Sequence, residues 1–495
     1  MKTQNLRKVG AALQESLGGE QRHVIGGKRV ASESGATFET LDPASGETLA
    51  SVSYAEPADV DNAVAAAREA FTVGSEWRAM TPAARGDVIA QLATLIERHT
   101  DDLAELECLD NGKPLKFAKR VDVRGAVNHL RYFAGWPTKI EGATLPVSVP
   151  NLFGYTQREP VGVVAQIIPW NFPLLMTAHK AAPALAAGCT IVLKPAEQTP
   201  LSALRVADLA LEAGVPPGVF NVIAGDGETG KALVSHPGVD KISFTGSTAV
   251  GREIGATAGR ELKRVTLELG GKSPNIILPD ADFDAAVKGS FTGIYFNSGQ
   301  VCAAASRLFI PHKNLDEILG RLTEQAKKTI PGPGLEPETF VGPVVSAEQH
   351  DRVRSYLDRG RAEAELVAGG SADRTNGGYF VEPTVFMTAD DSATIVREEI
   401  FGPVLVAQGY DYLEEVAARA NDTDYGLAAG VWTKSLSSAH RLASLLRAGQ
   451  VYVNVWNPGD PVAPFGGFKA SGVGREHGRE GLDAYLETKS VLMRI

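Results

Sequence analysis

Apolar residues recur at helical spacing through the first part of the chain. This spacing predicts a helix over 57–71. A second helix is predicted from Thr81-Pro82, with Thr as the N-cap and Pro in the first turn, to about His99. The next helix is predicted to end near Asn111-Gly112. Residues 1–50 are polar and hold one short strand-like run at 23–25.

Short continuous apolar runs then alternate with helical segments. Strands are predicted at 161–168, 190–193, 219–223 and 241–244. Helices are predicted over 173–187 and 201–213. Continuous apolar runs are typical of strands buried on both faces, and the alternation with helices predicts a doubly wound parallel sheet.

A second α/β lobe follows in the C-terminal half. Its candidate strands are 275–278, 307–310, 384–385 and 451–453. Its candidate helices are 315–329, 347–361, 413–421 and 437–447. Two segments stand apart from both lobes: residues 142–157 are β-prone and Pro-punctuated, as in a projecting hairpin, and residues 488–495 resemble an edge strand that needs a partner. Together they predict pairing between subunits.

Composition narrows the class of protein. A length of 495 residues suggests about three domains or lobes. The net charge of −10 and the lack of a dense basic run argue against nucleic acid as a partner. Three cysteines provide no disulfide framework and suit a reducing compartment. No secretory signal and no run of about 18 apolar residues is found, so we expect a cytoplasmic protein without a membrane partner.

One of the three cysteines stands in a reactive context. Cys108 and Cys189 occur among apolar residues, as is typical of core positions. Cys302 lies in Phe-Asn-Ser-Gly-Gln-Val-Cys-Ala, where small residues would leave the thiol accessible. A thiol is a candidate nucleophile, but it needs assistance because its ordinary pKa is about 8.5.

Two further segments could assist the thiol. Glu268 lies between two leucines, directly before Gly270-Gly271, so desolvation would raise its pKa towards that of a general base. The alternative is a surface Glu at a strand end. Asn171, in Pro-Trp-Asn-Phe-Pro, follows the 161–168 strand, at the edge where open parallel sheets bind ligands. Its amide could stabilise an oxyanion, or it could be a turn residue.

Taken together, these three segments resemble the aldehyde dehydrogenase superfamily. Further matching motifs, all in family order, are Lys194-Pro195-Ala196-Glu197, Phe244-Thr245-Gly246-Ser247, Glu398-Glu399-Ile400-Phe401-Gly402-Pro403 and Pro464-Phe465-Gly466-Gly467. The resemblance implies a cofactor-binding α/β lobe (1–141 and 159–270), a catalytic α/β lobe (271–470), and a small β oligomerisation arm and tail (142–158 and 486–495). It implies a homo-oligomer, either dimer or tetramer, that oxidises a small-molecule aldehyde.

The resemblance also implies the roles of individual residues. Cys302 would form a thiohemiacetal and then a thioester, which water activated by Glu268 would hydrolyse, while Asn171 would bind the oxyanion. The implied cofactor-binding residues are Ile168, Pro169, Trp170, Lys194, Glu197, Gly225, Phe244, Gly246, Ser247, Leu269, Glu399 and Phe401. Substrate contacts are expected from Phe172, Leu175, Met176, His179, Phe296, Val301, Trp456 and Phe465.

The position of the cofactor pyrophosphate is open to two interpretations. Gly225-Asp226-Gly227-Glu228-Thr229-Gly230 matches the G-x-G-x-x-G fingerprint literally. The family resemblance points instead to Gly246-Ser247, at a helix N-terminus. The carboxylate of Glu197 would accept hydrogen bonds from a free ribose 2′-hydroxyl and repel a 2′-phosphate, which favours NAD. Lys194 would soften that repulsion, so NADP use stays possible.

Several alternatives compete with oxidation of an apolar aldehyde. The mainly apolar pocket suits an aliphatic or aromatic aldehyde such as phenylacetaldehyde. Betaine-aldehyde-type relatives use an aromatic box, but a Trp usually stands where this chain has His179. An acylating enzyme that uses coenzyme A would lack the base Glu268, and a non-enzymatic binding protein would have lost site residues. The nine histidines show no H-E-x-x-H spacing, so no metal is predicted.

Overall fold

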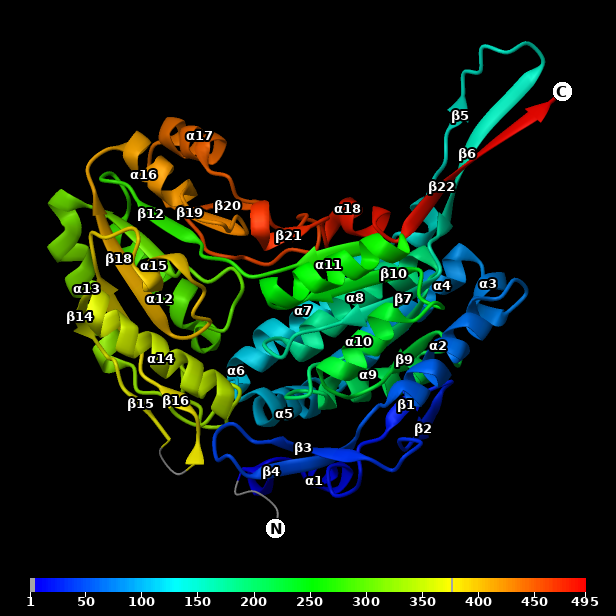
Figure 1. Ribbon diagram of the computed structural model, residues 1–495, viewed down its shortest axis with the longest axis horizontal. Coiled ribbons are helices and arrows are strands. Elements are labelled where there is room, and N and C mark those ends of the chain that lie inside the picture. The colour runs from blue at the N-terminus through cyan, green and yellow to red at the C-terminus, as the bar shows by residue number, and fades with distance from the viewer. Residues whose placement is uncertain (1–4, 375–376) are drawn as a thin grey trace.

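The computed structural model describes residues 5–374 and 377–495. Residues 1–4, which open the predicted cofactor-binding segment, lie outside the described residues. Two large sheets, each covered by helices, lie side by side, and a narrow sheet projects from one of them (Figure 1). The prediction of an α/β fold with two doubly wound lobes and a β arm is confirmed.

The first sheet contains eight strands in the order β2-β1-β9-β8-β7-β10-β11-β21. The strands are β1 (His23–Ile25), β2 (Lys28–Val30), β7 (Val163–Ile167), β8 (Thr190–Lys194), β9 (Phe220–Val222), β10 (Lys241–Thr245), β11 (Arg264–Glu268) and β21 (Gly472–Val473). Strands β7 to β11 are parallel. The chain runs outward from β7 through β8 to β9 and returns to β10 beside β7. A crevice therefore lies where the strand order reverses, between the loops that follow β7 and β10.

Helices cover both faces of this sheet. They include α2 (Pro57–Phe71), α4 (Pro82–Arg98), α5 (Thr100–Asn111), α7 (Arg124–Ala134), α8 (Pro173–Ala187), α9 (Leu201–Glu212), α10 (Gly227–Ser235) and α11 (Thr248–Glu261). Alternate residues of β7 enter different cores: Val164 packs with α4, α7 and α8, whereas Val163 packs with α2 and α10. The predicted cap is present, because the Thr81 side chain accepts a hydrogen bond from the Ala84 amide at 3.3 Å.

The second sheet contains seven strands in the order β14-β17-β18-β13-β12-β19-β20. They are β12 (Pro274–Ile277), β13 (Arg307–Pro311), β14 (Glu365–Ala368), β17 (Thr384–Met387), β18 (Val404–Tyr410), β19 (Ala428–Trp432) and β20 (Gln450–Val453). Its helices are α12 (Phe283–Tyr295), α13 (Leu315–Lys328), α14 (Ala347–Glu363), α15 (Thr394–Arg397), α16 (Leu413–Asn421) and α17 (Leu436–Leu445). The strand candidates at 275–278, 307–310, 384–385 and 451–453 all lie in this sheet.

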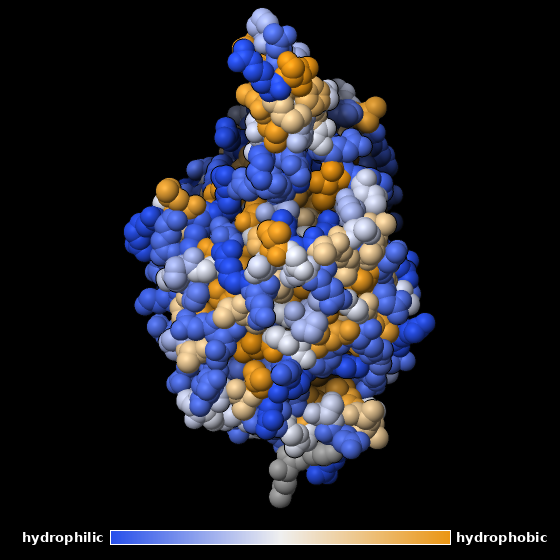
Figure 2. Space-filling view, turned by 90° about the vertical axis from the view of Figure 1, so that its right-hand side faces the viewer, coloured by the Kyte–Doolittle hydropathy of each residue, from blue (hydrophilic) through white to orange (hydrophobic). Residues whose placement is uncertain are grey.

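The projecting arm is a three-stranded sheet in the order β22-β6-β5. Its strands are β5 (Thr144–Leu145), β6 (Leu152–Pro160) and β22 (Leu486–Arg494). Strand β22 pairs antiparallel with β6 along its whole length, so the tail finds one partner strand in its own chain. Figure 2 shows the arm standing clear of the body with apolar atoms on its surface. Val149, Phe153, Leu492, Met493 and Ile495 are exposed there.

The chain crosses between the two sheets twice near Glu268. Residues 269–273 lead from β11 to β12, and later β21 returns to pair with β11, where Gly472 faces Glu268. The remaining elements are α1 (Ala11–Ser16), β3 (Thr37–Leu41), β4 (Thr48–Ser53), α3 (Glu76–Ala79), α6 (Leu115–Phe117), β15 (Ala372–Asp373), β16 (Phe380–Val381) and α18 (Gly478–Asp483). Among the described helices, none combines the length and apolar character needed to cross a bilayer.

Candidate active site

The loops that carry Asn171 and Cys302 are hydrogen-bonded to each other. Asn171 follows β7, and its Nδ2 donates to the carbonyl of Gln300 at 2.8 Å. In return, Nδ2 of Asn297 donates to the carbonyl of Asn171 at 3.0 Å. Asn297 and Ser298 have φ values of 51° and 55°, in the left-handed region. Such strained backbone is characteristic of functional sites, where the surroundings hold it in place.

Cys302 lies at the end of this turn with a half-buried side chain. Burial, and then the carboxylates of Glu399 and Glu268, raises the pKa of the thiol to about 12. A Cβ built at Gly271 would lie 2.5 Å from the carbonyl oxygen of Cys302, so only glycine permits this approach of the two loops. Cys108 and Cys189 are buried, as predicted for core residues.

Glu268 ends β11 and is 2% exposed. Among the described residues, neither of its carboxyl oxygens has a hydrogen-bond partner. Burial, and then the charge of Glu476, raises the pKa of Glu268 well above its ordinary value, and Lys180 and Arg475 oppose this shift. The desolvation expected between Leu267 and Leu269 is therefore present in the structure.

A buried ion pair lies close to this carboxyl and was not predicted. Nζ of Lys180, on α8, contacts Oε1 of Glu476 and donates to Oγ of Ser243 at 3.1 Å. Sequence spacing gives no signal for this pair, because 296 residues separate its members. The pair places two opposite charges beside Glu268.

The predicted cofactor residues gather at the carboxyl edge of the first sheet. Pro169 and Trp170 follow β7, Lys194 ends β8, and Gly246 and Ser247 follow β10. Ser247 caps α11 by accepting from the Val250 amide at 3.3 Å, and the first turn of α11 has no acidic residue. Oε2 of Glu197 lies 3.5 Å from Nζ of Lys194.

The second sheet supplies the remaining cofactor candidates from the loop before β18. Oε1 of Glu399 accepts a hydrogen bond from the Gly271 amide at 3.0 Å. Burial raises the pKa of Glu399 to about 7, and the Gly271 amide and Lys272 oppose this shift. Phe401 has a φ of 61°, and its ring meets the Trp170 ring edge to face at 5.1 Å. Candidates from both sheets therefore meet across the crevice.

The literal G-x-G-x-x-G segment follows β9, and its last four residues, 227–230, form the first turn of α10. Its Asp226, however, caps α10 with a carboxylate that accepts from the Glu228 amide at 2.9 Å. A negative side chain already occupies this helix N-terminus, which disfavours a phosphate there. A Cβ at Gly225 would lie 2.1 Å from Oγ1 of Thr229, so this glycine serves a tight turn.

Three of the predicted cofactor residues have side chains in the protein core. Ile168 is 2% exposed, Phe244 5% and Leu269 6%. The Phe244 ring lies against Gly246, where a Cβ would come within 2.5 Å of Cζ. These residues can offer a ligand only backbone groups.

The predicted substrate residues form two groups on either side of Cys302. One group is apolar and continues into the core below α8 and α12: Phe172, Leu175, Met176, Phe296 and Val301. The other group packs with Cys302 itself and contains Trp456 and Phe465. The Trp456 indole lies against Gly430, where a Cβ would be 2.3 Å from Cζ3. Apolar side chains thus dominate the surroundings of the thiol.

His179 belongs to neither group, because it packs against two other histidines. Its ring centroid lies 3.8 Å from that of His129 and 4.3 Å from that of His477. All three side chains are buried. Burial lowers the pKa of His129 to about 4 and the pKa values of His179 and His477 well below their ordinary value. Sequence spacing did not predict this cluster, because its members come from three distant segments.

Comparison with known proteins decides the family. The profile of the Aldehyde dehydrogenase family matches residues 30–491. This chain belongs to the aldehyde dehydrogenase family. DhaS of Bacillus subtilis (strain 168) is 54% identical over 490 residues, which cover 99% of this chain and 98% of DhaS. Phenylacetaldehyde dehydrogenase of Pseudomonas fluorescens is 48% identical over 479 residues, 95% of each chain.

Solved structures agree with this assignment. The NAD+ complex of aldehyde dehydrogenase from Bacillus cereus matches with a TM-score of 0.97 and 50% identity, covering 98% of this chain and 99% of that one. The protein is therefore an aldehyde dehydrogenase, an oxidoreductase that uses NAD(P) and acts on small aldehydes.

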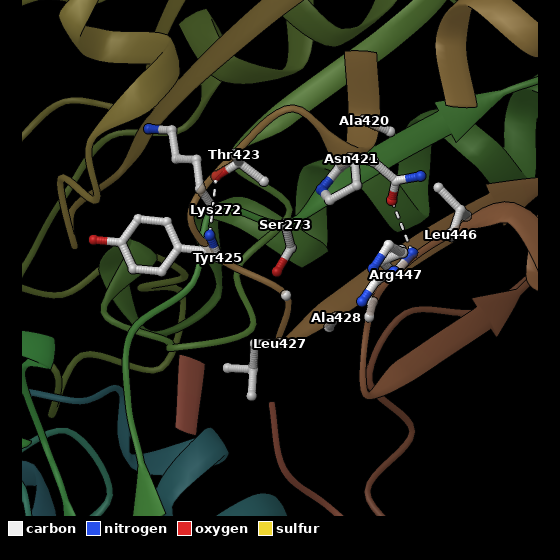
Figure 3. Close-up of a pocket in the computed structure, with 14 residues that line it drawn as sticks. Lys272, Ser273, Ala420, Asn421, Thr423, Tyr425, Leu427, Ala428, Leu446 and Arg447 are labelled. Atoms are coloured by element: carbon white, nitrogen blue, oxygen red, sulfur yellow. Dashed lines mark hydrogen bonds between the residues drawn. The ribbon is translucent and has the colours of Figure 1, made fainter. Parts of the chain in front are cut away.

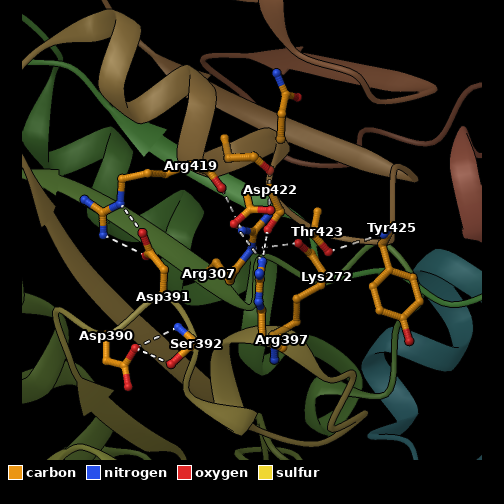
Figure 4. A network of polar contacts seen from close by, with 12 residues as sticks. Lys272, Arg307, Asp390, Asp391, Ser392, Arg397, Arg419, Asp422, Thr423 and Tyr425 are labelled. Carbon is orange, nitrogen blue, oxygen red and sulfur yellow. Dashed lines mark hydrogen bonds and ion pairs between the residues drawn. The ribbon is translucent and has the colours of Figure 1, made fainter.

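The linker between the two sheets of the aldehyde dehydrogenase is held by a buried arginine (Figure 4). Arg307 donates to the carbonyl of Lys272 at 3.0 Å and to that of Ala420 at 2.7 Å. Arg419, beside it, pairs with both carboxyl oxygens of Asp391 at 2.8 and 2.9 Å. Because Lys272 follows Glu268 by four residues, this network holds the segment through which the chain leaves β11.

Two cavities of the aldehyde dehydrogenase have linings that do not include Cys302. One, of about 10 Å³, lies between Lys272–Pro274 and the segments 420–429 and 446–448 (Figure 3). At most a single water would fit there. The other, of about 840 Å³, is an open groove at the amino ends of β10 and β11, the edge of the sheet opposite the site.

Proposed function

We propose that this aldehyde dehydrogenase oxidises apolar or aromatic aldehydes to carboxylic acids with NAD, through a thioester on Cys302. The main observation behind this proposal is the pair of polar side chains, Asn171 and Glu268, that lie near the Cys302 thiol. On one side the Asn171 amide is locked to the carbonyl of Gln300. On the other side the Glu268 carboxyl is buried and unpartnered among the described residues. These contacts support the roles of nucleophile for Cys302, oxyanion donor for Asn171 and general base for Glu268.

The residues at the crevice fit an NAD molecule. Ser247 and the amides of α11 form a helix N-terminus whose first turn has no acidic residue, which suits a pyrophosphate. Lys194 and Glu197 would hold the adenosine ribose, and Glu399 the nicotinamide ribose. When bound, NAD supplies the hydride acceptor.

The residues of the chain perform the remaining steps. Once the thiol of Cys302 has lost its proton to solvent, Sγ bonds as the thiolate to the carbonyl carbon, the C=O π bond breaks, and the oxygen becomes an oxyanion. The Nδ2 group of Asn171 has a second N–H beyond the one given to Gln300, and with the Cys302 amide it donates to this oxyanion. Departure of a hydride from the same carbon leaves a thioester.

Glu268 completes the reaction. Its carboxylate takes a proton from water, and the water oxygen attacks the thioester carbon. The C–S bond breaks, the acid leaves, and the thiolate of Cys302 is regenerated. Because this step needs the base, retention of Glu268 favours hydrolysis over transfer to coenzyme A.

NAD is the better match of the two dinucleotides. The Glu197 carboxylate is half-exposed beside Lys194 and would repel a 2′-phosphate while accepting hydrogen bonds from a free 2′-hydroxyl. Lys194 reduces that repulsion, so NADP is the slower cofactor rather than an excluded one.

An apolar aldehyde is the substrate class that the pocket supports best. Trp456 packs in the same cluster as Cys302, and Phe172 and Phe296 belong to a neighbouring apolar cluster that includes Val301. The similarity to a phenylacetaldehyde dehydrogenase supports an aromatic aldehyde. Betaine aldehyde is the alternative, but the imidazole of His179 contacts other imidazoles rather than closing an aromatic box.

The arm supports a homodimer or a tetramer. Strand β22 is the outer strand of its sheet and carries exposed apolar residues, so a second copy would complete the sheet. Light scattering at micromolar concentration tests this, and a monomeric mass would contradict it.

Absorbance of NADH tests the reaction with a panel of acetaldehyde, hexanal, phenylacetaldehyde, betaine aldehyde and succinic semialdehyde. We expect the highest kcat/KM for phenylacetaldehyde or hexanal and no turnover in Cys302→Ala. A preference for betaine aldehyde or the semialdehyde would overturn the substrate class. Turnover that requires coenzyme A would overturn the hydrolytic mechanism.

A further inference from the structure

Three buried imidazoles converge at one point in the first lobe. His129 lies on α7, His179 on α8, and His477 immediately before α18. One ring nitrogen of each lies within 4.8 Å of one nitrogen of each of the other two. The aldehyde dehydrogenase reaction derived above uses none of these nitrogens.

We propose that His129, His179 and His477 form a binding site for one divalent transition-metal cation such as Zn²⁺. Imidazole nitrogen is a preferred ligand of such cations, and three protein ligands with one open position are typical of zinc sites that bind a water or a substrate oxygen.

The hydrogen bonds of the cluster leave suitable lone pairs. Nδ1 of His129 lies 2.9 Å from the carbonyl of Gly125 and donates its proton there, so Nε2 carries a lone pair. A backbone carbonyl on the second nitrogen is the usual arrangement behind a metal-bound histidine. Among the described residues, Nε2 of His129 and Nε2 of His179 have no partner, although both are buried.

The spacing of the nitrogens is close to that of a zinc site. Nε2 of His477 lies 3.0 Å from Nδ1 of His179. Two nitrogens bound to one tetrahedral zinc at about 2.0–2.1 Å lie about 3.3 Å apart. These two nitrogens share a hydrogen bond, so its proton must leave when a cation binds, as is usual for metal binding to imidazole. The two ligands then need little movement, and the third must approach by at most about 1.5 Å, within the reach of a side-chain rotation.

The charges around the cluster are compatible with a cation. Glu476 precedes His477 in the chain, and its charge, with that of Asp460, acts on His129. Lys180 is the opposing cation, but its ammonium group is paired with Glu476. The Phe465 ring lies 5.6 Å from the His477 ring, so the cluster borders the residues that pack against Cys302. A bound cation would thus lie near the residues that pack with Cys302.

Metal content of the full-length protein tests the proposal without any substrate or cofactor. The protein is stripped with a chelator, equilibrated with Zn²⁺, and measured by calorimetry and elemental analysis. We expect one Zn²⁺ per chain in the wild type, with affinity lower by more than about tenfold in His179→Gln and His477→Gln. His312→Gln, which changes an exposed histidine paired with Asp411, and Cys302→Ala are the matched controls and should bind normally.

Three results would overturn the site: no bound Zn²⁺ in the wild type, unchanged affinity in both histidine variants, or loss of binding in Cys302→Ala. If the histidine variants fail to fold, the visible spectrum of the Co²⁺-loaded wild type shows instead which kind of ligand holds the metal. Bands of four-coordinate Co²⁺ with nitrogen and oxygen ligands are expected, and a thiolate charge-transfer band would assign the metal to Cys302 instead.

Discussion

The side-chain amide of Asn171 donates a 2.8 Å hydrogen bond to the backbone carbonyl of Gln300, two residues before Cys302. One N–H of the amide thus fixes its direction, while the other remains for a ligand. The same contact joins a loop of the first sheet to a loop of the second. The Asn171 side chain therefore helps to hold the loop that carries Cys302, and it also presents an N–H group close to the thiol.

Asn171→Ala should lower kcat by about 10²–10³ because it removes an oxyanion donor. Asn171→Asp should be at least as severe, since its carboxylate would face both the Gln300 carbonyl and the developing oxyanion. Steady-state rates with the best aldehyde of the panel measure both effects. A loss of less than tenfold in Asn171→Ala would show that the amide only ties the two loops together.

The rate should rise with pH because Glu268 acts as a base only when ionised. Burial and Glu476 hold the pKa of Glu268 well above its ordinary value, so the carboxylate is scarce at low pH. Glu268→Gln should abolish steady-state turnover but still release a burst of NADH, since only thioester hydrolysis needs the base. Rapid mixing would detect that burst, and its absence would place Glu268 in an earlier step.

Glu476→Gln should move this rise in rate to lower pH. The substitution removes a negative charge that raises the pKa of Glu268, and it leaves the positive charge of Lys180, which lowers that pKa, without its partner. The pH profile of kcat measures the shift. A profile unchanged from the wild type would mean that Glu476 does not act on the base.

Alkylation by iodoacetamide should modify Cys302 alone in the native protein. Cys108 and Cys189 are buried, so the reagent cannot reach their thiols, whereas Cys302 is partly exposed. The reaction should be slow at neutral pH, because the pKa of Cys302 is about 12. Glu399→Gln removes one of the charges that raise this pKa and should speed the reaction. Mass spectrometry identifies the site, and labelling of Cys108 or Cys189 at a similar rate would contradict the prediction.

Arg307→Met should destabilise the protein by about 2–4 kcal/mol, since the buried carbonyls of Lys272 and Ala420 would lose their charged donor. The expected result is a clear fall in Tm. Arg354→Met, at an exposed position, is the matched control and should change stability by less than about 0.5 kcal/mol. Equal Tm values for the two variants would show that the buried network adds nothing.

Much of the fold was predictable because its patterns are local. The helices at 57–71 and 173–187 begin with Pro, and α8 ends at Gly188, signals that act within one turn. Strands β18 and β19 were not predicted. The small residues Ala428, Ala429 and Gly430 have little β propensity, and their place in the sheet depends on packing with β12 and β20.

The residues of the candidate site show the same difference between local sequence motifs and contacts that only the fold creates. Cys302, Glu268 and Asn171 were found because each lies in a distinctive short motif. Lys180, Glu476 and the three clustered histidines occur in unremarkable surroundings and come together only through the fold. The pairing of the tail with β6 was not predicted either. The sequence of an edge strand indicates that it pairs with another strand, but it does not identify that strand.

The return of the chain to the first sheet has a consequence for synthesis on the ribosome. Strand β11 carries Glu268, but its outer neighbour β21 is synthesised about two hundred residues later. The sequence separation between β6 and its partner β22 is longer still. One edge of the first sheet and one edge of the arm therefore stay uncovered until translation is almost complete. A nascent chain of this design needs protection by a chaperone or by slow, cooperative closure, and truncation before residue 472 would leave the catalytic strand open to aggregation.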